Sequence, residues 1–237
     1  MPHAFKKPIF CYVTDRHALG ADNSIPSLLN RIDMAARAGV DWIQIREKDL
    51  PAREMLDLAS QTVALATAAH NENATRNTRI IVPRVVVPRI IVNDRLDVAL
   101  ASGSAGVHLS GESAPVTDIV RWCQNGNAPA DFLIGVSCHD LKGAFKAANG
   151  GASYLFWGPI FDTPSKRAFG PPQGTSKLAE VCEAISIPVI AIGGVNEENC
   201  KQCFRAGAHG VAAIRFFQNA QESGALRSTL DRIRGMS

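Results

Sequence analysis

The sequence predicts an α/β fold, a single (βα)8 TIM barrel that takes up residues 1–237. Strand-like and helix-like segments alternate eight times along the chain, and α/β barrels commonly reach this length as one domain. Parallel strands need helical crossovers, and an eighth unit closes the sheet. An open doubly wound sheet is the alternative, but no Gly-x-Gly-x-x-Gly motif follows the first strand.

The first half of the chain gives four of these units. An apolar run at 9–14 predicts the first strand, and apolar residues at helical spacing over 27–38 predict a helix that Gly39 ends. The other expected elements are strands at 42–46, 89–93 and 106–109, and helices from about Pro51, around Leu96–Leu100 and at 116–123.

The second half gives the other four units. The continuous apolar run at 187–192 is typical of a strand buried on both faces. We also expect strands at 132–136, from about Ser153 and at 210–214, with helices at 141–148, 178–185, 199–206 and 226–233.

One segment breaks the alternation, and we interpret it as an irregular insertion at about residues 71–88. A five-residue unit repeats almost three times from Arg79, and only its last copy runs into the third strand. Pro83 and Pro88 cannot donate ladder hydrogen bonds, which argues against central strands. The segment is either a surface loop or an apolar edge that pairs with another subunit, so homo-oligomer formation stays open.

The amino-acid composition limits the possible binding partners and the cellular compartment of the protein. Hydrophobic residues make up 46% of the chain, enough for a large core, and a net charge of +3 is too small to indicate a nucleic-acid partner. The chain has no apolar run long enough for a membrane span and no signal-peptide core near its start. Six scattered cysteines fit a reducing cytoplasm, and the lone Cys200-x-x-Cys203 pair is interpreted as packing rather than metal ligation.

Polar residues follow the predicted strands, where the functional groups of a barrel lie. Gln44 and Arg46 share the inward face if Ile43 and Ile45 point to the helices. Such groups are costly inside a barrel unless an anion sits between them. The remaining candidates at strand ends are Lys48, Asn93, Asp94, Ser137, His139, Thr163, Ser165, Lys166, Gly194 and Arg215.

The stretch from Ser153 to Lys166 points to phosphate binding. Gly158 and Pro159 end the strand, and two hydroxyls and an ammonium follow within four residues. Together with Asp94, the four cationic candidates favour a phosphorylated or diphosphorylated small molecule as the ligand, with Mg²⁺ bridging to Asp94. These cations are Arg46, Lys48, Lys166 and Arg215. The simpler alternatives are a surface charge run at 46–48 and a helix N-cap at 93–94.

Seven ordered motifs resemble those of the thiamine-phosphate synthases, and the related thiazole tautomerases share much of the pattern. The resemblance implies a (βα)8 transferase that couples hydroxymethylpyrimidine diphosphate with thiazole phosphate, giving thiamine phosphate and diphosphate. The motifs are Tyr12–Asp15, Gln44–Lys48, Asn93–Arg95, Gly106–Leu109, Gly135–His139, Gly158–Lys166 and Ala191–Val195.

The resemblance also implies a role for each site residue. Asp94 is the Mg²⁺ ligand, and the catalytic candidates are Arg46, Lys48, Ser137, His139 and Lys166. The pyrimidine diphosphate would be held by Gln44, Arg46, Lys48, Asn93, Ser137 and Lys166, and the thiazole phosphate by Thr163, Ser165, Gly194, Ile214 and Arg215.

Two departures from the synthase pattern keep other functions open. Ser113 stands where synthases usually carry a second metal-binding Asp, beside Glu112, and Arg215 stands where they commonly carry Ser. A thiazole tautomerase, acting on a thiazole carboxylate phosphate with His139 as acid and base, is one alternative. A non-catalytic barrel that binds a thiamine precursor is the other.

Overall fold

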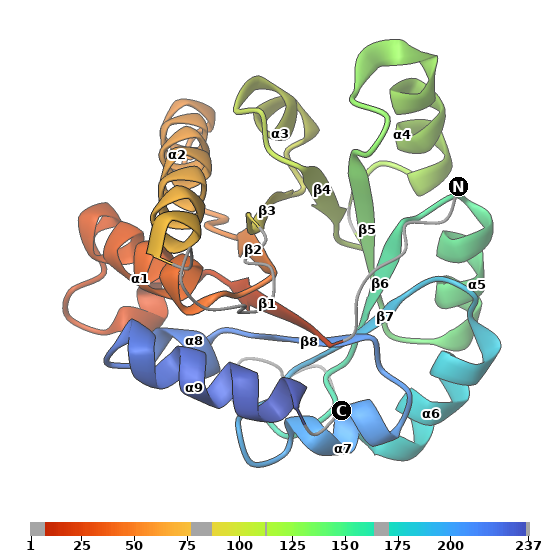
Figure 1. Ribbon diagram of the computed structural model, residues 1–237. Coiled ribbons are helices and arrows are strands. Elements are labelled where there is room, and N and C mark those ends of the chain that lie inside the picture. Colours follow the sequence, from red (N-terminus) through yellow and green to blue (C-terminus); the bar gives the residue numbers. More distant parts are fainter. Residues whose placement is uncertain (1–7, 77–86, 112, 164–170, 236–237) are drawn as a thin grey trace.

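The computed structural model describes residues 8–76, 87–111, 113–163 and 171–235, and these form a closed parallel barrel. The eight strands follow one another around the barrel in chain order, and β1 pairs with both β2 and β8. In Figure 1 the strands lie at the centre and the helices surround them. The predicted (βα)8 architecture is therefore confirmed.

The strands lie where the apolar runs predicted them, with ends that differ by a residue or two. Their bounds are β1 (Ile9–Val13), β2 (Trp42–Ile45), β3 (Arg89–Asn93), β4 (Gly106–Leu109), β5 (Leu133–Cys138), β6 (Tyr154–Trp157), β7 (Val189–Ile192) and β8 (Gly210–Ala213).

A helix follows each strand. Ser24 caps the first of them by accepting the Ser27 N–H at 3.3 Å, and Gly39, with a φ of 89°, ends it. The main helices are α1 (Ile25–Ala38), α2 (Ala52–Arg76), α3 (Leu96–Ala101), α4 (Val116–Trp122), α5 (Leu141–Asn149), α6 (Gly174–Ala184), α7 (Cys200–Arg205) and α9 (Ser223–Arg234).

Three short elements were not expected from the sequence. They are a 3₁₀ turn η1 (Arg16–Leu19) after β1, a π turn η2 (Cys123–Asn127) after α4, and α8 (Arg215–Gln218) after β8. Elements of four or five residues carry no detectable hydrophobic period, so pattern reading passes over them.

The expected start of the irregular insertion at residue 71 was wrong. Helix α2 continues to Arg76, and Glu72 near its end pairs with Arg37 of α1 at 3.2 Å. This tertiary ion pair holds a polar helix end that has no apolar periodicity of its own. The proline-containing repeats at 77–86 lie outside the described residues.

Two apolar layers build the core, one inside the barrel and one between strands and helices. The inner layer contains Trp42, Tyr154 and Phe156, and the outer layer contains Ile43 and Ile45. Successive side chains of a strand point to opposite faces, so Gln44 lies on the inner face, as predicted. The inner layer forms the floor beneath the strand ends.

The paired cysteines of α7 belong to the outer layer. Cys200 and Cys203 are completely buried and form no disulfide, and burial raises the pKa of both thiols. No group of three or more metal-binding side chains occurs in the described part of the chain. Both side chains belong to the hydrophobic core, in line with the packing interpretation. Within the same residues, no helix is long and apolar enough to cross a membrane.

Gly210 sets how closely β8 can approach β1. A Cβ atom added there would lie 2.5 Å from the Ile9 carbonyl oxygen and 2.7 Å from the Ile9 Cβ. We expect Gly210→Ala to lower the free energy of unfolding by about 1–3 kcal/mol, because the crowded strands must move apart. Urea denaturation measures this.

Gly224 in α9 provides the matched control, since a Cβ added there meets nothing within 4 Å. Gly224→Ala should leave stability unchanged or raise it by about 0.4–1 kcal/mol. Equal losses for the two variants would contradict the close contact between β8 and β1.

Candidate active site

The carboxyl ends of all eight strands border one cavity of about 1450 Å³. It brings together most of the residues singled out in the sequence. These are Gln44, Arg46, Lys48, Asn93, Ser137, His139, Thr163, Gly194, Ile214 and Arg215. Asp94 lies just behind Asn93, and Ser165 and Lys166 lie outside the described residues.

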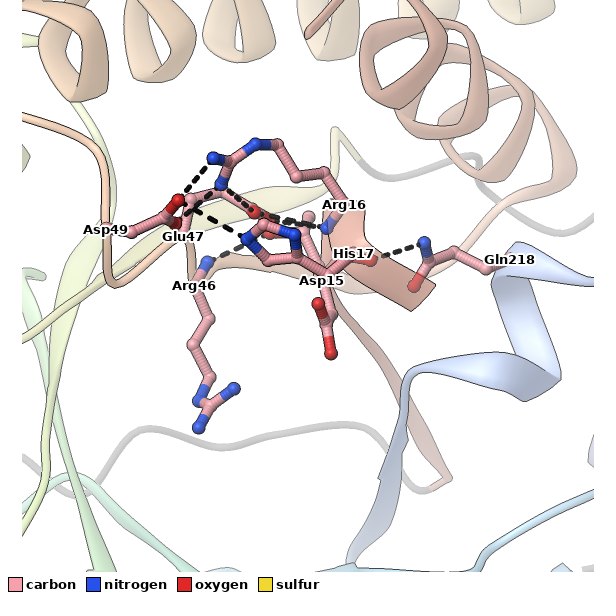
Figure 2. A network of polar contacts seen from close by, with 8 residues as sticks. Asp15, Arg16, His17, Arg46, Glu47, Asp49 and Gln218 are labelled. Atoms are coloured by element: carbon pink, nitrogen blue, oxygen red, sulfur yellow. Dashed lines mark hydrogen bonds and ion pairs between the residues drawn. The ribbon is translucent and has the colours of Figure 1, made fainter. Parts of the chain in front are cut away.

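Charged residues alternate in direction after β2. Arg46 and Lys48 line the cavity, whereas Glu47 and Asp49 accept hydrogen bonds from Arg16 of η1. Figure 2 shows the Arg46 guanidinium extending away from these two carboxylates. Within the described ranges neither Arg46 nor Lys48 has an ion-pair partner, so this segment is not a simple surface charge run.

The Arg16 network fixes the position of this segment. The Arg16 backbone N–H and its guanidinium contact Glu47, at 3.1 and 3.2 Å, and the guanidinium also binds Asp49 at 2.6 Å. The Glu47 side chain is only 1% exposed. The Arg16 guanidinium holds the pKa of Asp49 well below its usual range. In addition, Thr14 Oγ1 accepts the Arg46 backbone N–H at 2.9 Å.

Asp94 carries the carboxylate of the site at the end of β3. Its φ of 60° is unusual for a residue other than glycine. The carboxylate accepts from Ser110 N–H at 2.8 Å, from Asn93 Nδ2 at 2.7 Å and from the Ser113 hydroxyl. Burial raises the pKa of Asp94, but the bonds from Ser113 and Ser110 outweigh burial and lower it. The group is therefore ionised at neutral pH.

This carboxylate orients two neighbouring amides. Asn93 must donate its Nδ2 to Asp94, so its Oδ1 is left to accept Gln44 Nε2 at 2.9 Å. Gln44 is 2% exposed, and among the described residues its Oε1 has no hydrogen-bond partner. A buried, unpaired acceptor is costly. The amide oxygen of Gln44, a residue that lines the cavity, is therefore the atom left to accept a further hydrogen bond.

His108 is a residue of the site that the sequence reasoning missed. It borders the cavity floor at 1% exposure, and its Nε2 lies 2.8 Å from Ser137 Oγ. Burial, the largest cause, lowers the pKa of His108 to about 3, so the ring is neutral. The alternation of side chains along β4, which points His108 inward, could have identified it from the sequence. In the structure His108 pairs with Asn93 of β3.

The loop after β6 is clamped onto β7. Ile160 N–H donates to Ile192 O at 2.9 Å and Phe161 N–H to Gly193 O at 3.0 Å. Gly194 has a φ of 67°, and a Cβ there would lie 2.6 Å from the Asp162 carbonyl oxygen. Only glycine fits such a close approach. The clamp brings Thr163 to the cavity wall.

His139 meets this loop from the end of β5. Its Nδ1 lies 2.6 Å from the Gly158 carbonyl oxygen, which can only accept, so this nitrogen carries a hydrogen. Gln173 Nε2 in turn donates to the His139 carbonyl at 2.9 Å. These bonds hold the ring at the cavity wall.

The end of β8 offers a cation and free backbone donors. Arg215 begins α8 and lines the cavity with Ile214. Within the described residues the backbone N–H groups of Arg215 and Phe216 have no acceptor, and the Arg215 guanidinium has no ion-pair partner. Gln218 in α8 donates to the Asp15 carbonyl at 2.9 Å, which ties this end to the loop after β1.

Cations and backbone donors that have no partner among the described residues border a cavity at the strand ends, the position of the active site in (βα)8 enzymes. The family model for thiamine monophosphate synthase matches residues 10–217. The chain belongs to this family, whose members are transferases.

Relatives and solved structures agree. A putative thiamine-phosphate synthase of Geobacter sulfurreducens is 40% identical over 85% of this chain and 83% of its own length. The thiamine-phosphate synthase of Roseiflexus castenholzii is 39% identical over 90% and 82%. Thiamine phosphate pyrophosphorylase from Pyrococcus furiosus matches 96% of both chains, with a TM-score of 0.76 and 26% identity. The family resemblance found in the sequence is confirmed.

Thiamine-phosphate synthases need a divalent metal, and the residues around Asp94 fit one. The Asp94 carboxylate is ionised and only partly buried, and Oδ2 accepts one hydrogen bond from the residues that the structure describes. A hard divalent cation often uses one carboxylate together with water and substrate phosphates. Ser113 replaces a second carboxylate and instead donates to Asp94.

We expect Arg16→Met to lower the free energy of unfolding by about 2–3 kcal/mol, because the buried Glu47 carboxyl would lose its cationic hydrogen-bond partner. Asp49→Asn should cost much less, since Asp49 is 51% exposed. Urea denaturation of both variants compares them. Equal losses would show that the buried Glu47 is not what the Arg16 side chain stabilises.

Proposed function

We propose that this chain couples hydroxymethylpyrimidine diphosphate with thiazole phosphate to give thiamine phosphate and diphosphate. The observation that supports this best is the convergence of Arg46, Lys48, Arg215 and the neighbouring Asp94 on one cavity. Unpaired cations in a recess favour anionic ligands, and the two ends of the cavity suit two separate phosphate groups.

The first substrate would lie between β2 and β5. Arg46 and Lys48 would neutralise its diphosphate, and Ser137 would donate a hydrogen bond to it. The unpaired Oε1 of Gln44 would accept the amino group of the pyrimidine, with Asn93 holding Gln44 in orientation. We assign Lys166 to the diphosphate as well; it lies outside the described residues.

The second substrate would lie between β6 and β8. Its phosphate would take hydrogen bonds from the backbone at Gly194, Ile214 and Arg215, from Thr163, and from the Arg215 guanidinium. Ser165, which lies outside the described residues, is assigned to the same phosphate.

The chemistry needs charge stabilisation and orientation more than a side-chain nucleophile. Diphosphate leaves the pyrimidine methylene carbon, and the thiazole nitrogen captures the cation that remains. Arg46, Lys48 and Ser137 stabilise the charge gathering on the leaving group. Mg²⁺, held by Asp94, would neutralise part of that charge. His139 borders the reacting groups and keeps its ring fixed through Gly158.

The remaining assignments follow from the chemistry. We propose Mg²⁺ as the metal, phosphorylated small molecules as the partners, and the cytoplasm as the compartment. The six cysteines, all within the described residues, form no disulfide, which supports a reducing environment.

A coupling assay with both phosphorylated substrates, with and without Mg²⁺, tests the proposal. We expect Mg²⁺-dependent thiamine phosphate formation that Asp94→Ala lowers at least about 100-fold, because the variant loses the metal-binding carboxylate. Asp97→Ala is the matched control, since Asp97 is an exposed residue of α3 paired with Arg95.

Two other results would redirect the assignment. Turnover of a thiazole carboxylate phosphate that ignores both Mg²⁺ and Asp94→Ala would favour the tautomerase, with His139→Ala as the next variant. Metal-dependent binding of the pyrimidine diphosphate without any turnover would favour the non-catalytic binding protein.

We expect Arg215→Ser to raise the KM for thiazole phosphate about 10-fold while leaving the KM for the pyrimidine diphosphate unchanged. The reason is the loss of a charge-assisted contact at one end of the cavity only. Steady-state kinetics with each substrate varied in turn separates the two constants. A lower KM for thiazole phosphate would mean that Arg215 obstructs the pocket instead of gripping the phosphate.

A further inference from the structure

A chain of three hydrogen-bonded polar groups, two of them buried, runs from the barrel interior to the cavity. The Tyr154 hydroxyl lies 3.1 Å from His108 Nδ1, and His108 Nε2 lies 2.8 Å from Ser137 Oγ. Tyr154 and His108 are 0% and 1% exposed, and Ser137 lines the cavity. The chain therefore connects a group that water does not reach with one that a ligand does.

The environment of the tyrosine hydroxyl limits where its hydrogen can go. Among the described residues, His108 Nδ1 is the one hydrogen-bond partner of the Tyr154 hydroxyl. Gly135 makes room for the ring, since a Cβ there would lie 2.1 Å from Tyr154 Cζ. Burial raises the pKa of Tyr154 well above its ordinary value, so the hydroxyl keeps its hydrogen. That hydrogen needs an acceptor, because a buried unpaired donor costs about 1–3 kcal/mol.

The acceptor has to be the imidazole. A neutral histidine has one donor and one acceptor nitrogen. In the described part of the chain no carboxylate bonds to either ring nitrogen of His108, and the ring is buried, so it is neutral. If Nδ1 accepts from Tyr154, then Nε2 carries the hydrogen and donates to Ser137 Oγ.

The opposite tautomer leaves the site with the wrong polarity. If Nδ1 carried the hydrogen, the Tyr154 hydroxyl hydrogen would have no acceptor, and Ser137 would donate to His108 Nε2. Ser137 would then present only oxygen lone pairs to the cavity, which repel an anion. The buried tyrosine selects against this arrangement.

We propose that Tyr154 and His108 are positioning residues that direct the Ser137 hydroxyl hydrogen into the cavity, toward an oxyanion of the diphosphate substrate. The choice of diphosphate rests on the proposed function, whereas the hydrogen-bond direction does not. The chain has a counterpart on the neighbouring strands β2 and β3, where Asn93 pairs with His108. Asp94 and Asn93 leave Gln44 as an acceptor, while Tyr154 and His108 leave Ser137 as a donor. The two hydrogen-bonded chains thus give the floor of the site an acceptor and a donor.

Nitrogen-15 NMR of ring-labelled histidine tests the direction in the protein without substrate. We expect His108 to be neutral with its hydrogen on Nε2, and Ser137→Ala serves to assign the signal through its shift. Trp42→Phe, which alters the ring packed against Tyr154 at 4.7 Å but keeps the hydroxyl, should retain the same tautomer. A His108 ring with its hydrogen on Nδ1 in the unaltered protein would overturn the proposal.

Kinetics test the consequence. Tyr154→Phe should raise the KM for the pyrimidine diphosphate about 5-fold and leave the KM for thiazole phosphate unchanged, because Ser137 becomes free to donate to His108. In a Ser137→Ala background the same Tyr154 change should add nothing to that KM. An equal effect of Tyr154→Phe in both backgrounds would show that Tyr154 acts through packing and would overturn its positioning role. If NMR shows the Nε2–H tautomer but the coupling assay fails, only the assignment of the diphosphate substrate is lost. The direction of the hydrogen bonds would still stand.

Discussion

Backbone pairing between β8 and β1 is the constraint on which the rest of the structure depends. Ile9 pairs with Gly210 and Tyr12 with Ala213, so the first and last strands of the sheet become neighbours. Closure turns a row of strand ends into a ring. Side chains that are far apart in sequence then border one cavity, and Gln218 of α8 reaches back to the Asp15 carbonyl. The site exists because the sheet has no open edge.

The ring of strand ends has a defined polarity. Arg46 faces the cavity because Glu47, on the opposite side of the same segment, is held by Arg16 (Figure 2). Gln44 faces it as an acceptor because the ionised Asp94 orients the amide between them. In each case a group behind the cavity wall determines what the group in front presents. Preorganisation of this kind stabilises a developing charge without reorganisation during the reaction.

The strand positions could be predicted because buried strands form continuous apolar runs, and the inward face of β2 because side chains alternate along a strand. The contacts behind the cavity wall could not be predicted. The contacts of Arg16 with Glu47 and of Tyr154 with His108 join segments that only closure brings together, and no local pattern records them. Likewise, the replacement at Ser113 was visible as a lost carboxylate, but its bond to Asp94 was not. The polar end of α2 was misread because its ion pair with α1 is tertiary.

The most direct measurement is a crystal structure of the protein with thiamine phosphate, diphosphate and Mg²⁺. The account predicts both anions in the one cavity at the strand ends. Diphosphate should contact Arg46, Lys48 and Ser137, and the phosphate of the product should contact Gly194 and the start of α8. The central claim is that closure assembles one site for two phosphorylated groups. Either anion bound on a different face of the barrel would contradict it.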